Sequence, residues 1–387
     1  MPASNNKRIY YAVHQVGFKE DGIGNFVAAH GVQSVGMTTN FNLEQVFELG
    51  QLAIYENVEE IPDVEVTTNK VLDGYPLVYH LATQSSLTPT LASRSTEKTQ
   101  FAMAIFDDSL ESATGTADSE VVCSGMFVGS VAYNFPLDDN FNEDITLVGN
   151  NKIWRNDPKP TNPNLPTFPG FDGGFTSLDS PIGSGGVNRR ENLIFEFDAA
   201  SSLDVNSMVG DVDSTIMPPE VFGISNSGTN EKTNDVDFDA HFSNITVSAD
   251  LGRENINELG RKGPYFRSVT FPIEVTCEVE VTSTSGDMIS ATEDGIYTTG
   301  IEQCEQAGNL LDRTIRIATC EGTRIYLGVK NKLSSVNYAG GDAGGGNVTV
   351  TYTFTTFNDL TVMHTGDPNT NFDSTLLATR QTYLRDL

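Results

Sequence analysis

Basic residues are scarce in this sequence, which has 23 Lys and Arg against 52 Asp and Glu and a formal charge of −29. An acidic surface repels the phosphates of nucleic acid, so the composition argues against sequence-specific binding of DNA or RNA. The same repulsion would suit DNA that slides past the protein without adhering. The simpler interpretation, that acidity keeps a concentrated protein in solution, is the favoured one.

Cysteines and long apolar runs are also few. The four cysteines, Cys123, Cys277, Cys304 and Cys320, form no C-x-x-C pair and lie near no histidine cluster, which speaks against a zinc site. Cys277 falls on the apolar side of an alternating segment and is expected to be a small core residue. No stretch reaches the roughly twenty apolar residues of a membrane span, and the first residues have no signal-peptide core. We therefore expect a protein that folds in a reducing cytoplasm and has no membrane partner.

Motifs of catalysis are missing as well. There is no G-x-S-x-G nucleophile motif and no GxxxxGK phosphate loop, and Trp154 is the single tryptophan. Two oxygen-rich segments, 138–144 and 367–373, lack the glycine and glutamate of a calcium loop and are interpreted as solvated turns. The alternating Asp237, Asp239 and His241 are interpreted as an exposed polar face. The sequence predicts no catalytic residue, no metal and no cofactor.

What the sequence does contain is alternation. Apolar residues recur at every second position over 273–281, which predicts a strand with one buried face and an acidic face formed by Glu274, Glu278 and Glu280. Residues 347–357 show the same pattern, and 314–319 with 323–329 predict a hairpin. One amphipathic helix is expected over 300–311. The chain is predicted to be mainly β, built as an antiparallel sandwich or barrel with at least one flanking helix.

The strongest signal is an internal repeat. Residues 42–62 match 252–272 without a gap, 210 positions on, with Glu48-Leu49-Gly50 opposite Glu258-Leu259-Gly260 and Tyr55 opposite Tyr265. A second match lies 205 positions apart and places Val131 and Tyr133 opposite Val336 and Tyr338. The two matches occur in the same order, which predicts two similar β domains.

The repeat suggests a division of the chain into four parts. Residues 1–155 form a first β domain and residues 220–362 form a second. Between them, 156–219 is predicted to be a linker or insertion, because five prolines fall within 156–175, with a short hairpin near 191–197. Residues 363–387 are expected to be a C-terminal arm.

Three stretches resemble the tail tube (major tail) proteins of tailed phages: 125–154, 241–287 and 330–360. The resemblance rests on the order of strand, Gly-rich turn and alternating strand. It implies a β-sandwich or barrel whose copies join in rings that stack around a DNA channel, with the virion tail as the location. If the repeat is real, three chains would supply six folds in a pseudo-hexameric ring. A hexamer of the whole chain remains an alternative.

The resemblance also implies partners and contacts. The expected partners are further copies of the chain, the tape measure, terminator and baseplate proteins, and DNA that passes without specific binding. The acidic strand face lines either the channel or an outer wall. Contacts between subunits or rings are expected at Leu43, Val46, Phe47, Leu52, Ile54, Tyr55, Glu258, Tyr265 and Phe266. Alternative functions are a tail terminator, baseplate hub or capsid decoration protein and, less favoured, a polysaccharide-binding or polysaccharide-degrading enzyme.

Overall fold

The computed structural model describes residues 9, 11–21, 24–86, 88–107, 116–156, 166–172, 174–177, 186–199, 241–261, 263–282, 312–319, 321–340 and 348–364. The predicted helix over 300–311, the C-terminal arm after His364, the segment 367–373, and Asp237 and Asp239 lie outside these residues. So does half of the proline-rich stretch 156–175. The first two residues assigned to the arm, Met363 and His364, instead belong to a buried strand.

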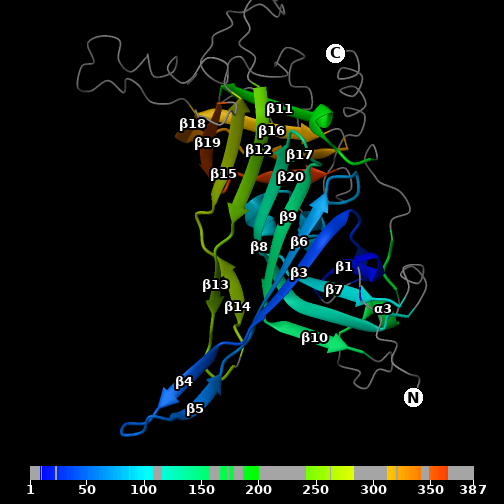
Figure 1. The fold of residues 1–387 in the computed structure, drawn as a ribbon, viewed down its shortest axis with the longest axis vertical. Coiled ribbons are helices and arrows are strands. Elements are labelled where there is room, and N and C mark those ends of the chain that lie inside the picture. Colours follow the sequence, from blue (N-terminus) through cyan, green and yellow to red (C-terminus); the bar gives the residue numbers. More distant parts are fainter. Residues whose placement is uncertain are drawn as a thin grey trace, which may run out of the picture.

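The protein is mainly β and antiparallel, as the alternation predicts (Figure 1). The strands of the first half are β1 (His14–Glu20), β2 (Val27–Ala28), β3 (Val32–Asn40), β4 (Leu43–Phe47), β5 (Ile54–Glu59), β6 (Asp63–Val71), β7 (Thr99–Ile105), β8 (Ser119–Pro136), β9 (Asn142–Gly149) and β10 (Asn151–Arg155). Those of the second half are β11 (Leu193–Ala199), β12 (His241–Asp250), β13 (Arg253–Ile256), β14 (Phe266–Val269), β15 (Glu274–Thr282), β16 (Arg313–Thr319), β17 (Thr323–Tyr326), β18 (Lys332–Ala339), β19 (Thr349–Phe357) and β20 (Thr361–His364).

Helices are short. They are α1 (Val78–Ala82), α2 (Leu91–Arg94) and α3 (Pro169–Asp172), with single 3₁₀ turns at Tyr11–Val13 and Arg190–Asn192. None of the three helices was expected from the sequence. Each has too few residues to show a helical period, and α1 forms where Val78 and Tyr79 donate their backbone N–H groups to the buried carboxylate of Glu143.

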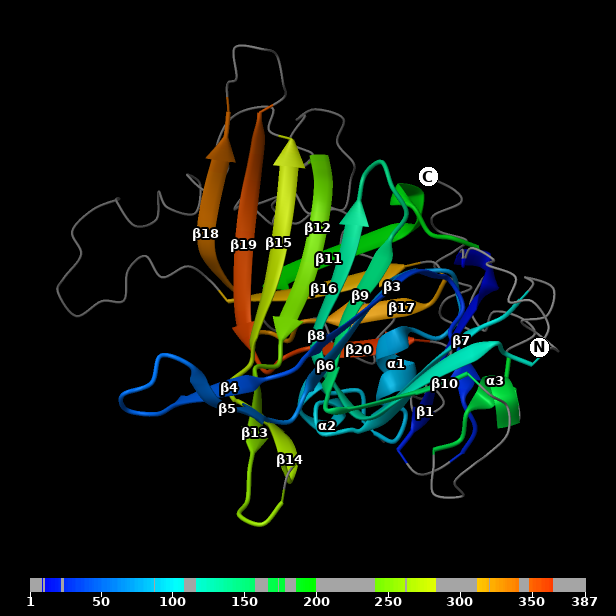
Figure 2. The ribbon, with the colours of Figure 1, turned by 60° about the horizontal axis from the view of Figure 1, so that its bottom comes forward.

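One large sheet runs through both halves of the chain. Its strands follow the order β18-β19-β15-β12-β8-β9-β6-β3, so β12 of the second half pairs directly with β8 of the first. Strand β8 is long, and its first part leaves this ladder to pair with β7 and β10. We call the ladder from β18 to β3 the large sheet (Figure 2).

A second layer covers one face of the large sheet. It consists of the strands β2-β1-β7-β8-β10 in the first half and β11-β16-β17-β20 in the second. The main core lies between the layers and draws buried apolar side chains from both halves. Cys277 is among them at 1 % exposure, which confirms its prediction as a core residue. Among the described strands the sheets remain open, so the structure is a sandwich and shows no closed barrel.

The two halves share one topology. Strands β3, β6, β9 and the end of β8 lie in the same order as β12, β15, β19 and β18. Irregularities in register also coincide: one lies between Val32 and Ser34 in β3 and between Phe242 and Asn244 in β12. Another lies between Val128 and Ser130 in β8 and between Leu333 and Ser335 in β18. The two pairs of irregularities are separated by the same 210 and 205 positions as the sequence matches, so the repeat in the sequence is also a repeat in the fold.

Several local expectations can be compared directly. The predicted hairpin of β16 and β17 and the strands β15 and β19 are confirmed. Residues 193–199, inside the predicted linker, form no hairpin of their own and instead pair as β11 with β16. The domain boundaries at 155, 219 and 362 stay predictions.

Both outer edges of the large sheet are open in the part of the chain that the structure describes. Strand β3 pairs with β6 alone and β18 with β19 alone. Residues 32–40 of β3 contain no charge and no proline, and β18 has a single charge at Lys332. Proteins normally protect such edges with lysines, prolines or a covering segment, because a bare edge pairs with other chains. Two nearly uncharged edges are therefore candidates for contact with further strands.

Candidate assembly surfaces

The face of the large sheet that points away from the core is polar and acidic. Alternation places Glu274, Glu278 and Glu280 on this outer face, while Val275, Cys277 and Val279 are buried. Glu278 lies between Thr246 and Thr353 on the neighbouring strands, so its nearest cross-strand partners are neutral. Further acids on the same face are Asp63, Glu65, Asp144 and Asp250.

Cations are almost absent from this outer face. In the described strands of the large sheet the basic residues are Lys70, which is fully buried on the core side, and Lys332. The Lys332 ammonium lies 3.7 Å from the Asp312 carboxylate. The face therefore presents hydroxyls, amides and carboxylates, and a polyanion would meet few positive charges there that could bind it.

Two hairpins project from the same end of the large sheet (Figure 1). The first hairpin is β4–β5 and links β3 to β6, whereas the second is β13–β14 and links β12 to β15. Their tips close in the same way, with Gln51 N–H donating to Glu48 and Arg261 N–H donating to Glu258. Gly50 and Gly260 adopt φ values of 90° and 87°, a region that glycine reaches without strain.

The first hairpin carries many exposed apolar side chains. Leu49 and Leu52 at its tip are 103 % and 104 % exposed, as free as in an extended peptide. The predicted contact residues Leu43, Val46, Phe47, Ile54 and Tyr55 lie on the same hairpin and are also exposed. Clustered exposed apolar residues are typical of a surface that another protein covers. The apolar residues Leu43, Val46 and Phe47 have a spacing that would also fit a helix, but this segment pairs with β5 as a strand.

The second hairpin presents fewer apolar side chains. Leu259 is 104 % exposed at its tip and Tyr265 is 60 % exposed, next to an ion pair of 3.8 Å between Arg261 and Glu258. Phe266 differs from the other predicted contact residues because it packs edge-on against Phe127, with ring centroids 5.5 Å apart. Phe266 therefore anchors this hairpin to β8 within the same chain.

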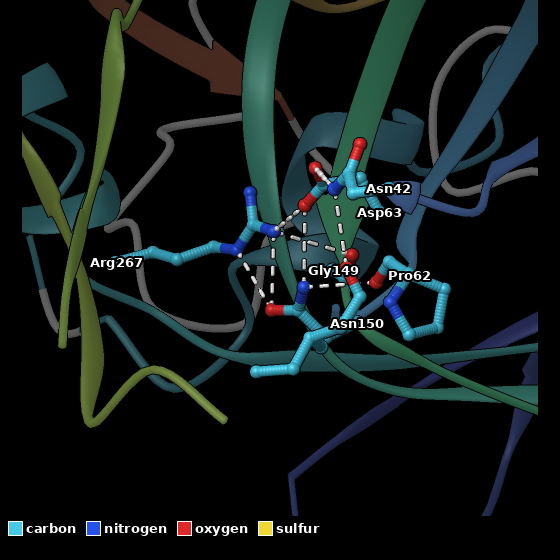
Figure 3. Close-up of polar contacts among 7 residues, drawn as sticks. Asn42, Pro62, Asp63, Gly149, Asn150 and Arg267 are labelled. Atoms are coloured by element: carbon cyan, nitrogen blue, oxygen red, sulfur yellow. Dashed lines mark hydrogen bonds and ion pairs between the residues drawn. The ribbon is translucent and has the colours of Figure 1, made fainter. Parts of the chain in front are cut away.

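A polar cluster joins the bases of the two hairpins (Figure 3). Arg267 of β14 is 7 % exposed, and its Nη2 lies 2.7 Å from Asp63 Oδ1, 3.1 Å from Asn150 Oδ1 and 3.3 Å from the Gly149 carbonyl oxygen. Asp63, the first residue of β6, also accepts from Asn42 at 3.0 Å and from Asn150 at 3.2 Å. We call Arg267, Asp63, Asn150 and Asn42 the base cluster. It connects the second hairpin to the root of the first.

The base cluster was missed by sequence reasoning. Asp63 and Arg267 are separated by 204 positions, and Arg267 occupies a position with no basic counterpart in the first hairpin, where Asn57 lies. The usable signal was an arginine inside a strand of an acidic chain, since a buried arginine needs a carboxylate or several carbonyls to accept its hydrogen bonds.

A buried carboxylate lies under the large sheet. Glu143 accepts hydrogen bonds from the backbone N–H of Val78 at 2.6 Å and of Tyr79 at 3.1 Å, and from the Tyr133 hydroxyl at 3.1 Å. Burial raises the pKa of Glu143 to about 7, against the lowering effects of the Lys70 charge and of these hydrogen bonds. Burial likewise raises the pKa of Glu120 to about 7.

Because the pKa values of Glu143 and Glu120 are raised, we expect the free energy of unfolding to fall as pH rises. Between their ordinary pKa of 4.5 and about 7 the folded chain holds protons that the unfolded chain has lost, so the free energy of unfolding decreases across this window. The contribution of Glu143 is up to about 3 kcal/mol. We expect the variant Glu143→Gln to show a flatter dependence of melting temperature between pH 5 and 7.5, whereas the exposed Glu65→Gln keeps the parent slope. Equal slopes in all three proteins would contradict this assignment.

The residues that the structure describes contain neither a cluster of metal-ligating side chains nor a membrane-spanning helix. No group of three or more His, Cys, Asp or Glu side chains there could hold a metal ion. The segment 138–144 is only in part the solvated turn that the sequence predicts, because Asn142 and Asp144 belong to strand β9. Asp144 accepts hydrogen bonds from Asn69 at 2.7 Å and Asn134 at 2.8 Å on the neighbouring strands. In the described part of the chain no helix is long and apolar enough to cross a membrane.

Comparison with known proteins gives limited likeness. No protein-family model and no curated protein matches the chain. Among solved structures, a chain of the anti-feeding prophage baseplate matches with a TM-score of 0.30 and 10 % identity, over 39 % of this chain and 97 % of that one. A chain of the anti-feeding prophage tube-terminating cap matches with a TM-score of 0.29 and 11 % identity, over 41 % of this chain and 100 % of that one.

Proposed function

We propose that this chain is a non-catalytic structural protein of a virion tail, whose copies form rings that stack into a tube through which DNA passes. The observation that supports this function most directly is the combination of surfaces on the large sheet. One face packs on the core, the other is acidic and nearly free of cations, and one end of the sheet extends two hairpins with exposed apolar side chains.

Each surface has a role in such a tube. The outer face with Glu278 and Glu280 lines the channel, where negative charge lets DNA slide. The first hairpin reaches the adjacent ring and buries Leu49 and Leu52 there. The open edges of β3 and β18 serve contacts within a ring, and three chains with two units each complete a pseudo-hexamer. The remaining partners are the tape measure, terminator and baseplate proteins.

Negative-stain electron microscopy of the purified protein, with rotational averaging of end views, tests this proposal. Rings or tubes with a central channel are the expected result, and native mass spectrometry of single rings should then give three chains. Six chains would overturn the pseudo-hexamer and keep the tube. A protein that remains monomeric at high concentration would overturn the tube and favour a terminator, hub or decoration protein.

A further inference from the structure

The pairing of β8 with β12, which joins the two halves of this chain, indicates how two chains can pair with each other. Strand β8 pairs with β12 in one register, which places Ser130 opposite Asp250 and Val131 opposite Ala249. The ladder extends beyond these strands, since Leu251 N–H donates to the Gly129 carbonyl at 2.9 Å. This internal junction joins the last strand of the first unit to the first strand of the second.

Both strands of the junction have a free counterpart elsewhere in the chain. The counterpart of β12 is β3, 210 positions earlier, and the counterpart of β8 is β18, 205 positions later; each shares the irregularity of its equivalent. These counterparts, β3 and β18, are the two open edges of the large sheet. Strands β3 and β12 run in the same direction, so β18 would meet a β3 antiparallel, as β8 meets β12.

We propose that β18 of one chain pairs with β3 of a second copy in the register of the internal junction. This inference rests on the proposed function, in which the chains form a ring, and it takes its geometry from the internal junction. The register follows when each β8 residue of the internal junction is replaced by the β18 residue 205 positions later, and each β12 residue by the β3 residue 210 positions earlier. The residues that then lie opposite one another are Ser335 and Asn40, Val336 and Thr39, Asn337 and Thr38, Tyr338 and Met37, and Ala339 and Gly36. The contact is head to tail, because the two edges differ.

Exposed apolar residues at the open edges agree with this register. Phe41 is 67 % exposed, whereas its counterpart Leu251 is fully buried at the internal junction. Tyr338 is 56 % exposed, whereas its counterpart Tyr133 is fully buried under β12 and its neighbours. A second copy would cover both aromatic side chains, and it would pair backbone groups that the described strands leave without a ladder.

Cysteine cross-linking tests the register. Asn337 and Thr38 are exposed and lie on the outer face, and residues directly opposite in an antiparallel pair have Cα atoms about 4.5–5.5 Å apart, within disulfide range. The variants Asn337→Cys and Thr38→Cys are made separately, each with Cys304→Ser and Cys320→Ser, and then mixed under a mild thiol oxidant. Cys123 and Cys277 are buried and stay in place.

The expected result is a disulfide-linked dimer in the mixture and none in either variant alone. As an off-register control, Asn337→Cys mixed with Ser34→Cys should not cross-link, because four residues along a strand correspond to about 13 Å. A dimer in one variant alone would indicate an edge paired with its own copy and would overturn the proposal. Rings or tubes without a cross-link in the mixture would overturn the register and leave the tube function standing. If neither rings nor a cross-link are observed, both the register and the tube function are overturned.

Discussion

Replacing Leu49 and Leu52 by serine should prevent the rings from stacking while leaving the single chain as stable as the parent. Both side chains are fully exposed in the free chain, so their removal costs nothing in folding. In a tube, each would be buried against the adjacent ring. Burying a leucine contributes about 1.5–3 kcal/mol, so the pair contributes roughly 3–6 kcal/mol per contact.

That energy corresponds to an increase of about 10²- to 10⁴-fold in the concentration needed for half-maximal assembly. Sedimentation velocity over a concentration series measures this shift, and thermal melting checks that the fold is unchanged. Gln51→Ala, in the same turn, is the matched control and should assemble like the parent. Unchanged assembly of the double variant would show that the first hairpin is not a ring contact. A fall in melting temperature would show that it packs on its own chain.

The sequence repeat predicted more of this fold than composition did. The matches at 210 and 205 positions correctly identified two pairs of equivalent positions. They are Leu49 and Leu259 at the hairpin tips, and Tyr133 of β8 and Tyr338 of β18. Strand alternation alone placed Glu278 on an exposed face and Cys277 in the core. These features depend on local pattern, which a single sequence displays.

Features set by distant partners could not be predicted in this way. Phe266 resembles its exposed neighbours in sequence, but it is held by Phe127 across the junction of the two halves. The spacing of Leu43, Val46 and Phe47 fits a helix as well as a strand, and pairing with β5 decides between them. Short helices such as α1 form where a tertiary contact supplies a hydrogen-bond acceptor for the first backbone N–H groups, here the carboxylate of Glu143.

Arg267 is the residue whose loss should most disturb the single chain. Its guanidinium is 9 % exposed and contacts one carboxylate, one amide oxygen and one carbonyl, all from the first half of the chain. Removing it leaves Asn150 and Gly149 with unmatched acceptors and Asp63 without its cation. Asp63 is 46 % exposed and can be rehydrated, which limits the cost. We expect Arg267→Ala to lower the free energy of unfolding by about 2–4 kcal/mol.

Two comparisons separate this role from a general effect of charge. Arg261→Ala, on the same hairpin, removes an exposed ion pair with Glu258 and should cost less than about 1 kcal/mol. Arg267→Lys keeps the attraction to Asp63 but cannot contact Asn150 and Gly149 at once, so it should fall between the parent and the alanine variant. Equal stabilities for Arg261→Ala and Arg267→Ala would show that the base cluster contributes little.

The base cluster should also control the position of the second hairpin. Because Arg267 connects β14 to β6 and to the turn after β9, its loss should release the hairpin while β15 stays in the large sheet. Hydrogen exchange should therefore accelerate at amides in 253–269 of Arg267→Ala and remain slow in 275–281. Uniform acceleration in both segments would instead mean that Arg267 stabilises the whole sandwich, in which case the direction of the hairpin would be set by the aromatic contact of Phe266 with Phe127.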